Sequence, residues 1–253
     1  LPADEVEEVC ICDASSQGRV SAVRRMLAAG VGADEEEGGT GKTPLFLACQ
    51  ENHPDVVAAL LSAGADVDKA DDNGTTPLSM ACEDGFEDCA RLLVDKGADL
   101  DRADNEGQTP LFMACELGFV DCAGLLVDRG ADLDKARDDG ATPLCIACVN
   151  GFSDCVELLA DKGADVDKAR DDGTTPLHTA CRGGFPGCAK ALVDGGACVD
   201  RPNNEGHTPL FVALKSRCHD CVELLLGAGA DLGIETPHGA ALDAEIAAML
   251  QGL

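Results

Sequence analysis

The stretch Asn105–Arg137 reads NEGQTPLFMACELGFVDCAGLLVDRGADLDKAR, and it recurs along the chain with a period of 33 residues. A fixed period of roughly 20 to 50 residues is typical of stacked supersecondary units, each of which contacts only its neighbours. The sequence therefore predicts one elongated repeat protein. The triplet Thr-Pro-Leu marks the start of each copy, with no insertion between copies, at Thr43, Thr76, Thr109, Thr142, Thr175 and Thr208.

Each copy predicts two short helices and a loop. Thr109 is suited to cap the first helix, and Pro110 to occupy its first turn, where a missing N–H costs nothing. Gly118 and Gly130 are suited to end the two helices, because the residue after a helix often adopts a left-handed conformation. Residues 131–140 are rich in Asp and Gly and predict a turn or hairpin. The apolar spacing assigns the buried faces to Leu111, Ala114 and Cys115 in the first helix and to Phe119, Cys122, Leu125 and Leu126 in the second.

These motifs resemble the ankyrin repeat: Gly-x-Thr-Pro-Leu, an Ala-Cys pair, Gly-Phe, Leu-Leu and Gly-Ala-Asp, all at 33-residue spacing. The resemblance implies an all-α solenoid of stacked helix-turn-helix units with projecting β-hairpin loops. It also implies a concave groove formed by the loops and the first helices. The chain departs from the pattern where Arg217 replaces the helix-ending Gly and Cys218 the aromatic residue, and where Asp replaces the usual Asn at Asp68, Asp101, Asp134, Asp167 and Asp200.

The period divides the chain into six full repeats between two divergent ends. We expect residues 1–38 to form a divergent N-terminal capping repeat and residues 237–253 a truncated C-terminal capping unit. The predicted full repeats are 39–71, 72–104, 105–137, 138–170, 171–203 and 204–236.

The chain is strongly acidic, with a formal net charge of −28. Residues 1–38 contain nine acids and three bases, and residues 72–104 add nine acids and three bases more. Such a field repels phosphate backbones and anionic lipid surfaces, and it speeds encounter with basic partners. We therefore expect neither nucleic acid nor membrane as a partner, but a protein with basic segments.

The 15 cysteines predict buried thiols. Ten of them fall on the predicted buried helix faces, where a free cysteine behaves as a small hydrophobic residue. We expect a reduced protein of the cytoplasm or nucleus, with no signal peptide and no membrane span. The two cysteine registers are Cys49, Cys82, Cys115, Cys148 and Cys181, and Cys89, Cys122, Cys155, Cys188 and Cys221.

No combination of residues predicts catalysis, a cofactor or a small-molecule substrate. Cys145 and His178 occupy equivalent positions of adjacent repeats, but helix spacing of about 8–10 Å separates a nucleophile from its base. The Cys145/Cys148 and Cys218/Cys221 pairs each lack a second pair to complete a zinc site. The Asp-rich loops lack a calcium cage, and we expect their carboxylates to bond turn backbone within and between loops, although weak calcium binding stays open.

The partner surface is expected where the copies differ. Four positions vary: the residue before Thr-Pro, the residue after Leu, and the two that close the first helix. By the resemblance, the first and the last two face the groove. We predict a monomer whose partner contacts come from Lys42, Phe46, Gln50, Glu51, Thr75, Ser79, Glu83, Asp84, Gln108, Phe112, Glu116, Leu117, Ala141, Val149, Asn150, Thr174, Arg182, His207 and Lys215.

Along this strip the charge changes sign. Acidic side chains come first, then the apolar Leu117 and Val149, then Arg182 and Lys215. We interpret the chain as a non-catalytic scaffold for a partner segment that is basic at one end, apolar in the middle and acidic at the other. The alternatives are an ion-binding or redox-responsive sensor, which would use the Asp loops or the cysteines, and a targeting or autoregulatory module of a larger enzyme.

Overall fold

The structure is a computed structural model that describes residues 10–231, and the predicted C-terminal cap lies outside these residues. The described chain is all helix and loop and contains no strand. The helices are α1 Ile11–Ser16, α2 Val20–Ala28, α3 Pro44–Gln50, α4 Pro54–Ser62, α5 Pro77–Glu83, α6 Glu87–Asp95, α7 Pro110–Leu117, α8 Val120–Asp128, α9 Pro143–Asn150, α10 Ser153–Asp161, α11 Pro176–Gly183, α12 Pro186–Asp194, α13 Pro209–Lys215 and α14 His219–Gly227.

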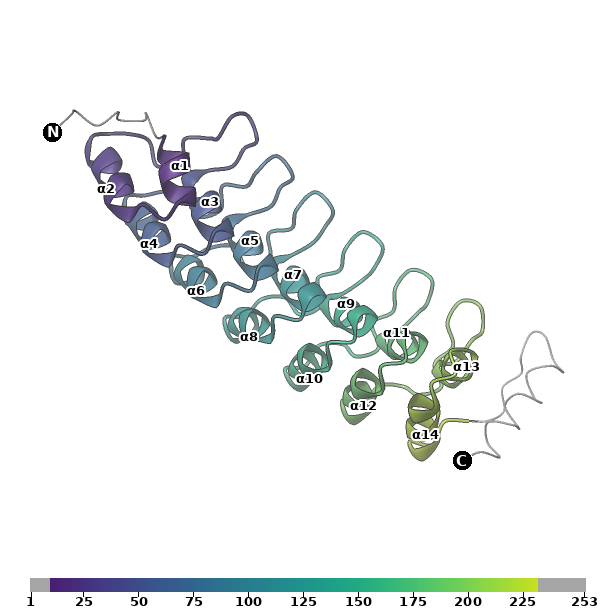
Figure 1. The fold of residues 1–253 in the computed structure, drawn as a ribbon. Helices are drawn as coiled ribbons and strands as arrows, with labels where there is room; N and C mark the ends of the chain where they lie inside the picture. The colour runs from purple at the N-terminus through teal and green to yellow at the C-terminus, as the bar shows by residue number, and fades with distance from the viewer. Residues whose placement is uncertain (1–9, 232–253) are drawn as a thin grey trace. The chain divides into compact units, whose positions relative to one another are not determined.

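The helices belong to two compact units, whose boundary falls within α7. The first unit comprises residues 1–114 and 121–132, and the second comprises 115–120 and 133–253. Within the first, α1, α3 and α5 pack side by side in one layer, and α2, α4 and α6 form the other. Within the second, α9, α11 and α13 form one layer, and α10, α12 and α14 the other (Figure 1). Each unit is a stack of antiparallel helix pairs.

The Thr-Pro pair starts the first helix of each repeat as predicted. The hydroxyl of Thr109 accepts a hydrogen bond from the backbone N–H of Phe112 at 3.2 Å, and Thr142 does the same for Cys145 at 3.1 Å. Proline occupies the first turn of these helices. The cap satisfies one of the backbone donors that the first turn leaves without a partner.

The second helix of the central repeat begins one residue later than expected. α8 starts at Val120, so Phe119 precedes the helix and is half-buried. The reason is visible in the second unit, where Phe152 and Phe185 occupy the N-cap positions of α10 and α12. Their rings lie against Gly118 and Gly151, the glycines that end the preceding repeat's first helix.

The core consists mainly of leucine, alanine and cysteine. Leu111, Ala114 and Cys115 are fully buried, as are Cys122 and Leu126, which confirms the predicted buried positions on α7 and α8. Each loop turns through a short bridge, such as the hydrogen bond from the Asp104 N–H to the Gln108 carbonyl at 3.0 Å. The N–H of Asn105 donates to the carbonyl of Asn73 at 3.0 Å, so neighbouring loops of the first unit are tied together.

Candidate protein-interaction surface

The residues that close the first helices lie at the surface, as the sequence predicted. Glu51, Asn150, Arg182 and Lys215 are exposed, and Gln50, Glu83, Asp84 and Glu116 are half-buried. These positions are at or just beyond the last turn of α3, α5, α7, α9, α11 and α13.

The position after Thr-Pro-Leu does not contribute to the surface. Phe46, Ser79 and Phe112 expose at most 2% of their area, so these side chains are almost entirely covered. Each is the third residue of a helix, and the Ser79 hydroxyl lies 3.0 Å from that of Thr76 in its own repeat. Variation there reflects exchange of packing partners and not contact with solvent. The position before Thr-Pro is also largely covered at Gln108, Ala141 and Thr174, but it is half-buried at Lys42, Thr75 and His207.

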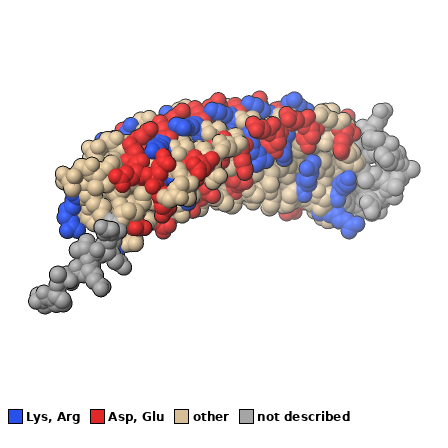
Figure 2. Space-filling view, turned by 90° about the horizontal axis from the view of Figure 1, so that it is seen from above, with Lys and Arg blue, Asp and Glu red and all other residues tan. Residues whose placement is uncertain are grey.

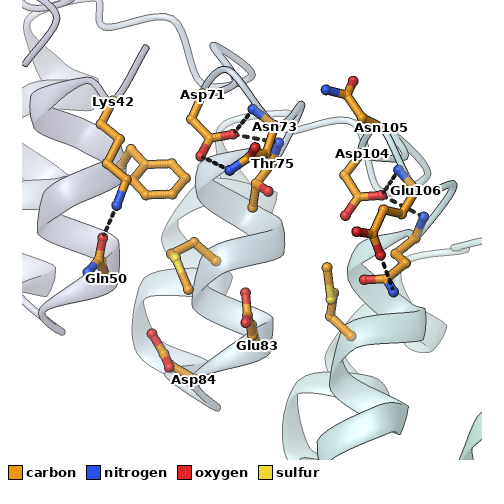
Figure 3. Close-up of a pocket in the computed structure, with 14 residues that line it drawn as sticks. Lys42, Gln50, Asp71, Asn73, Thr75, Glu83, Asp84, Asp104, Asn105 and Glu106 are labelled. Atoms are coloured by element: carbon orange, nitrogen blue, oxygen red, sulfur yellow. Dashed lines mark hydrogen bonds between the residues drawn. The ribbon is translucent and has the colours of Figure 1, made fainter. Parts of the chain in front are cut away.

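The first unit contains a hollow of about 610 Å³ between its loops and the ends of its first helices, shown in Figure 3. Its apolar lining comes from Phe46, Met80 and Met113. Its lining residues include five carboxylates but only one cation. The carboxylates are Asp71, Glu83, Asp84, Asp104 and Glu106, the cation is Lys42, and the other lining residues are Gln50, Asn73, Thr75, Asn105 and Gln108.

Two of these carboxylates hold the loops in shape. One oxygen of Asp71 accepts hydrogen bonds from the backbone N–H groups of Asn73 at 2.9 Å and Thr75 at 3.0 Å. One oxygen of Asp104 accepts from Glu106 at 2.9 Å and Gln108 at 2.8 Å, in the same arrangement one repeat later. Side chains that bond their own turn backbone favour the turn over other conformations.

Asp84 is in a different environment from these loop carboxylates. It lies at the end of α5 beside Glu51, and Figure 3 shows it next to Glu83. Partial burial, followed by the negative charge of Glu51, raises the pKa of Asp84. Burial and a like charge both penalise the ionised form, which a cation in contact with the carboxylate would relieve.

Lys42 occupies one end of the hollow. Its ammonium group donates a hydrogen bond to Oε1 of Gln50 at 3.0 Å and lies 5.2 Å from the centroid of the Phe46 ring. An amide oxygen and an aromatic face are both favourable neighbours for an ammonium ion.

The second unit presents a different surface. Leu117 exposes 46% of its area and Val149 41%, and they are the large hydrophobic side chains that the described residues leave exposed. Between the ends of α7 and α9, the side-chain N–H of Asn150 donates to the backbone carbonyl of Glu116 at 2.8 Å. Arg182 and Lys215 occupy the corresponding positions near the ends of α11 and α13.

The surface of the described chain carries both kinds of charge. On the face in Figure 2, acidic side chains lie along most of the described residues, with basic side chains among them. None of the helices in residues 10–231 is long and apolar enough to cross a membrane.

His178 and Cys145 have structural environments. Nε2 of His178 donates to the carbonyl of His207 at 2.8 Å, and Nδ1 accepts from Thr175, so both ring nitrogens are used. Burial lowers the pKa of His178 and raises that of Cys145. A catalytic thiol requires the opposite shift, towards the thiolate.

The Asp loops form a hydrogen-bond ladder. The carboxylate of Asp134 accepts from the backbone N–H of Asp165 at 3.1 Å, and Asp167 accepts from Cys198 at 3.0 Å. Within a loop, Asp165 accepts from the N–H of Asp167 at 3.0 Å. This confirms the expected bonding within and between loops. In residues 10–231, no three His, Cys, Asp or Glu side chains are arranged to hold a metal ion.

The structure pairs the cysteines in a way that the two sequence registers did not indicate. Each cysteine near the end of a first helix neighbours the one 40 residues later, in the second helix of the next repeat. The pairs are Cys49/Cys89 and Cys82/Cys122 in the first unit, and Cys115/Cys155, Cys148/Cys188 and Cys181/Cys221 in the second. All ten residues are buried and reduced.

Stacked helix pairs with projecting, mutually bonded loops define each unit as part of an all-α repeat solenoid. A sequence model for ankyrin repeats matches residues 11–104, 100–170 and 164–236. The chain therefore belongs to the ankyrin repeat family, whose repeats typically serve protein–protein interaction and are generally non-catalytic.

Two solved structures illustrate the similarity. The ankyrin repeat domain of Bcl-3, described as a unique member of the IkappaB protein family, is 32% identical with a TM-score of 0.78, covering 88% of this chain and all of that one. The human ASB11 ankyrin repeat domain is 30% identical with a TM-score of 0.74, covering 85% of this chain and 96% of that one. No curated protein sequence matches the chain.

Proposed function

We propose that the chain is a protein-interaction scaffold that binds a partner polypeptide at the loops and first-helix ends of its repeats. The observation that supports this most directly is the grouping of half-buried and exposed carboxylates at the ends of α3 and α5, where Glu51, Glu83 and Asp84 lie together. Complementary charge speeds association and selects the partner. The first unit therefore binds a segment with basic character.

The second unit binds an apolar side chain of the partner. Acidic residues of the partner follow that side chain. Leu117 and Val149 supply an exposed apolar contact of two large side chains, and Arg182 and Lys215 supply the cations. Burying large side chains that are otherwise exposed adds affinity, whereas peripheral charges chiefly set the association rate.

The test is a pull-down with the full chain at low and moderate salt. The bait variant combines Glu83→Lys with Glu116→Lys, and the control variant combines Asp55→Lys with Glu157→Lys. The control makes the same charge change at exposed sites on the outer helices α4 and α10. We expect a discrete, salt-sensitive partner that the first variant loses and the control retains.

A different result would contradict the proposed binding surface. If all three baits recover the same set of basic proteins, the acidity only keeps the chain in solution, and the helix ends are not the binding surface. A second variant, Leu117→Ser with Val149→Ser, tests the apolar contact, and we expect it to speed dissociation without changing the salt dependence.

A further inference from the structure

The hollow of the first unit already shows how it can hold a basic side chain. Lys42 enters from the loop side, passes over the Phe46 ring and ends at the Gln50 side-chain oxygen. An apolar surface supports the stem and an oxygen receives the head, as is usual for a partly buried lysine. The chain itself fills only one end of the hollow in this way.

The rest of the hollow has the same kinds of side chain, and its lining residues include no second cation. Met80 and Met113 line it with thioether side chains, which adapt to the shape of an inserted group. In the described part of the chain, no donor lies within hydrogen-bond distance of the Asp84 carboxylate, although Asp84 is half-buried and has Glu51 as a charged neighbour. A carboxylate in this position is stabilised by an incoming positive charge.

The size of the hollow fits an organic group. Its volume of about 610 Å³ is within the range of roughly 300–1,000 Å³ that is usual for sites that bind a small molecule or a few side chains. The apolar lining and the acidic rim together match an amphipathic cation, which has an aliphatic stem and a charged head. Lysine and arginine side chains have this chemistry.

We propose that the hollow of the first unit receives a lysine or arginine side chain of a partner polypeptide. The stem of that side chain lies on Met80 and Met113, and its charged head reaches the Asp84 carboxylate at the end of α5. This inference rests on the proposed function, because it names the part of the partner that the acidic surface selects.

The methionine methyl groups provide a local test. The full chain is labelled with ¹³C at the methionine methyls and titrated, at low salt, with two capped pentapeptides in which arginine or lysine alternates with glycine. We expect the Met80 and Met113 methyl signals to shift during the titration. The Met26 signal, from α2, should stay in place, since Met26 does not line the hollow.

Two variants distinguish peptide binding in the hollow from general attraction to the negative charge of the chain. Asp84→Asn removes the carboxylate at the hollow, and Asp55→Asn removes an exposed one on α4. We expect Asp84→Asn to weaken peptide binding about fivefold, as befits one partly exposed charge-assisted contact, and Asp55→Asn to leave it nearly unchanged. The peptide that gives the tighter binding identifies the preferred side chain.

Equal weakening by both variants, or shifts of Met26 as large as those of Met80, would overturn the inference, because binding would then be diffuse. This outcome is distinct from failure of the proposed function. A partner lost by the Glu83/Glu116 variant could still be recovered while the peptides showed no preference for the hollow. Conversely, selective peptide binding without any such partner would support the hollow and contradict the scaffold function.

Discussion

The carboxylate of Asp101 accepts a hydrogen bond from the backbone N–H of Asp132 at 2.8 Å, across the junction of two successive repeats in the first unit. The same bond joins Asp34 to Asp66 and Asp68 to Asp99, each at 2.9 Å. Because each repeat supplies the acceptor for the next, the ladder adds to the coupling between neighbours that stabilises a solenoid.

The ladder depends on an acceptor oxygen and not on the charge alone. Replacing Asp101 with Ala should therefore lower the free energy of unfolding by about 1 kcal/mol, as expected for one partly exposed hydrogen bond. Asp101→Asn keeps an oxygen in the same place and should cost less than half as much. Urea unfolding followed by circular dichroism measures both, and equal losses in the two variants would contradict the ladder as the cause.

Arg217 occupies a position that favours glycine. Its φ is 58°, whereas four of the five equivalent residues are glycines, such as Gly184 with a φ of 70°, and the fifth is Asn52 with a φ of 56°. Because the left-handed conformation costs a non-glycine residue about 1 kcal/mol, Arg217→Gly should stabilise the protein by a comparable amount. Thermal unfolding should show a higher midpoint, and a lower one would mean that the interactions of the Arg217 side chain outweigh the strain.

Alanine variants of Gly151 and Gly184 separate two costs: the backbone strain of a positive φ and the steric clash of a new Cβ. A Cβ on Gly151 would lie 2.6 Å from the Phe185 ring, whereas a Cβ on Gly184 would have no neighbour within 4 Å. Both have positive φ, so both alanine variants carry the backbone cost. We expect Gly184→Ala to destabilise by about 1 kcal/mol and Gly151→Ala by about 2–3 kcal/mol, because only the second must displace a packed ring. Denaturant unfolding of the two variants should show this order.

The thiols should fall into two classes. Cys10 and Cys198 are exposed and Cys218 is half-buried, whereas the other 12 are buried. Burial also raises the pKa of Cys49 and Cys148, and so removes the reactive thiolate. A thiol-reactive dye should therefore label two or three cysteines in the native protein and all 15 after unfolding. Rapid native labelling of many more would show that the paired cysteines are accessible.

Asp139 should contribute to stability at neutral pH but not in acid. Its carboxylate accepts hydrogen bonds from Nε of Arg137 at 3.0 Å and from the second guanidinium nitrogen at 2.8 Å, and Arg170 also binds it. The Arg137 hydrogen bond is the main cause of the lowered pKa of Asp139. A lowered carboxyl pKa stabilises the fold above the unfolded pKa of about 4, and the effect is lost as the pH falls further.

The corresponding variant is Asp139→Asn. It should destabilise the protein at pH 7 by about 1 kcal/mol or less, since the pair is partly exposed and solvent screens it. The difference from the original protein should shrink below pH 4. Unfolding experiments at pH 7 and pH 3 measure the change, and a difference that grows in acid would contradict the assignment.

Most of the fold could be predicted from the sequence, because it depends on local interactions. The helix starts at Thr-Pro, the glycines that end the first helices and the Asp bonds of the loops each depend on residues close in sequence, repeated every 33 positions. The surface positions of Glu51, Glu83 and Arg182 followed from the same period, because the end of a first helix has the same environment in each copy. The start of the second helix at Phe119 was misplaced by one position, because at the equivalent places in the second unit the rings of Phe152 and Phe185 lie against a glycine of the preceding repeat.

The sequence by itself thus determined the repeat, the helices, the acidic character and the end-of-helix surface of this protein. Only the tertiary structure decided which side chains meet across repeats. It buried Phe46, Ser79 and Phe112, brought ten of the cysteines into pairs 40 residues apart, and placed Asp84 beside a methionine-lined hollow. These features arise where neighbouring repeats of one unit pack together, and a one-dimensional period specifies each repeat but not the shape of the space between adjacent repeats.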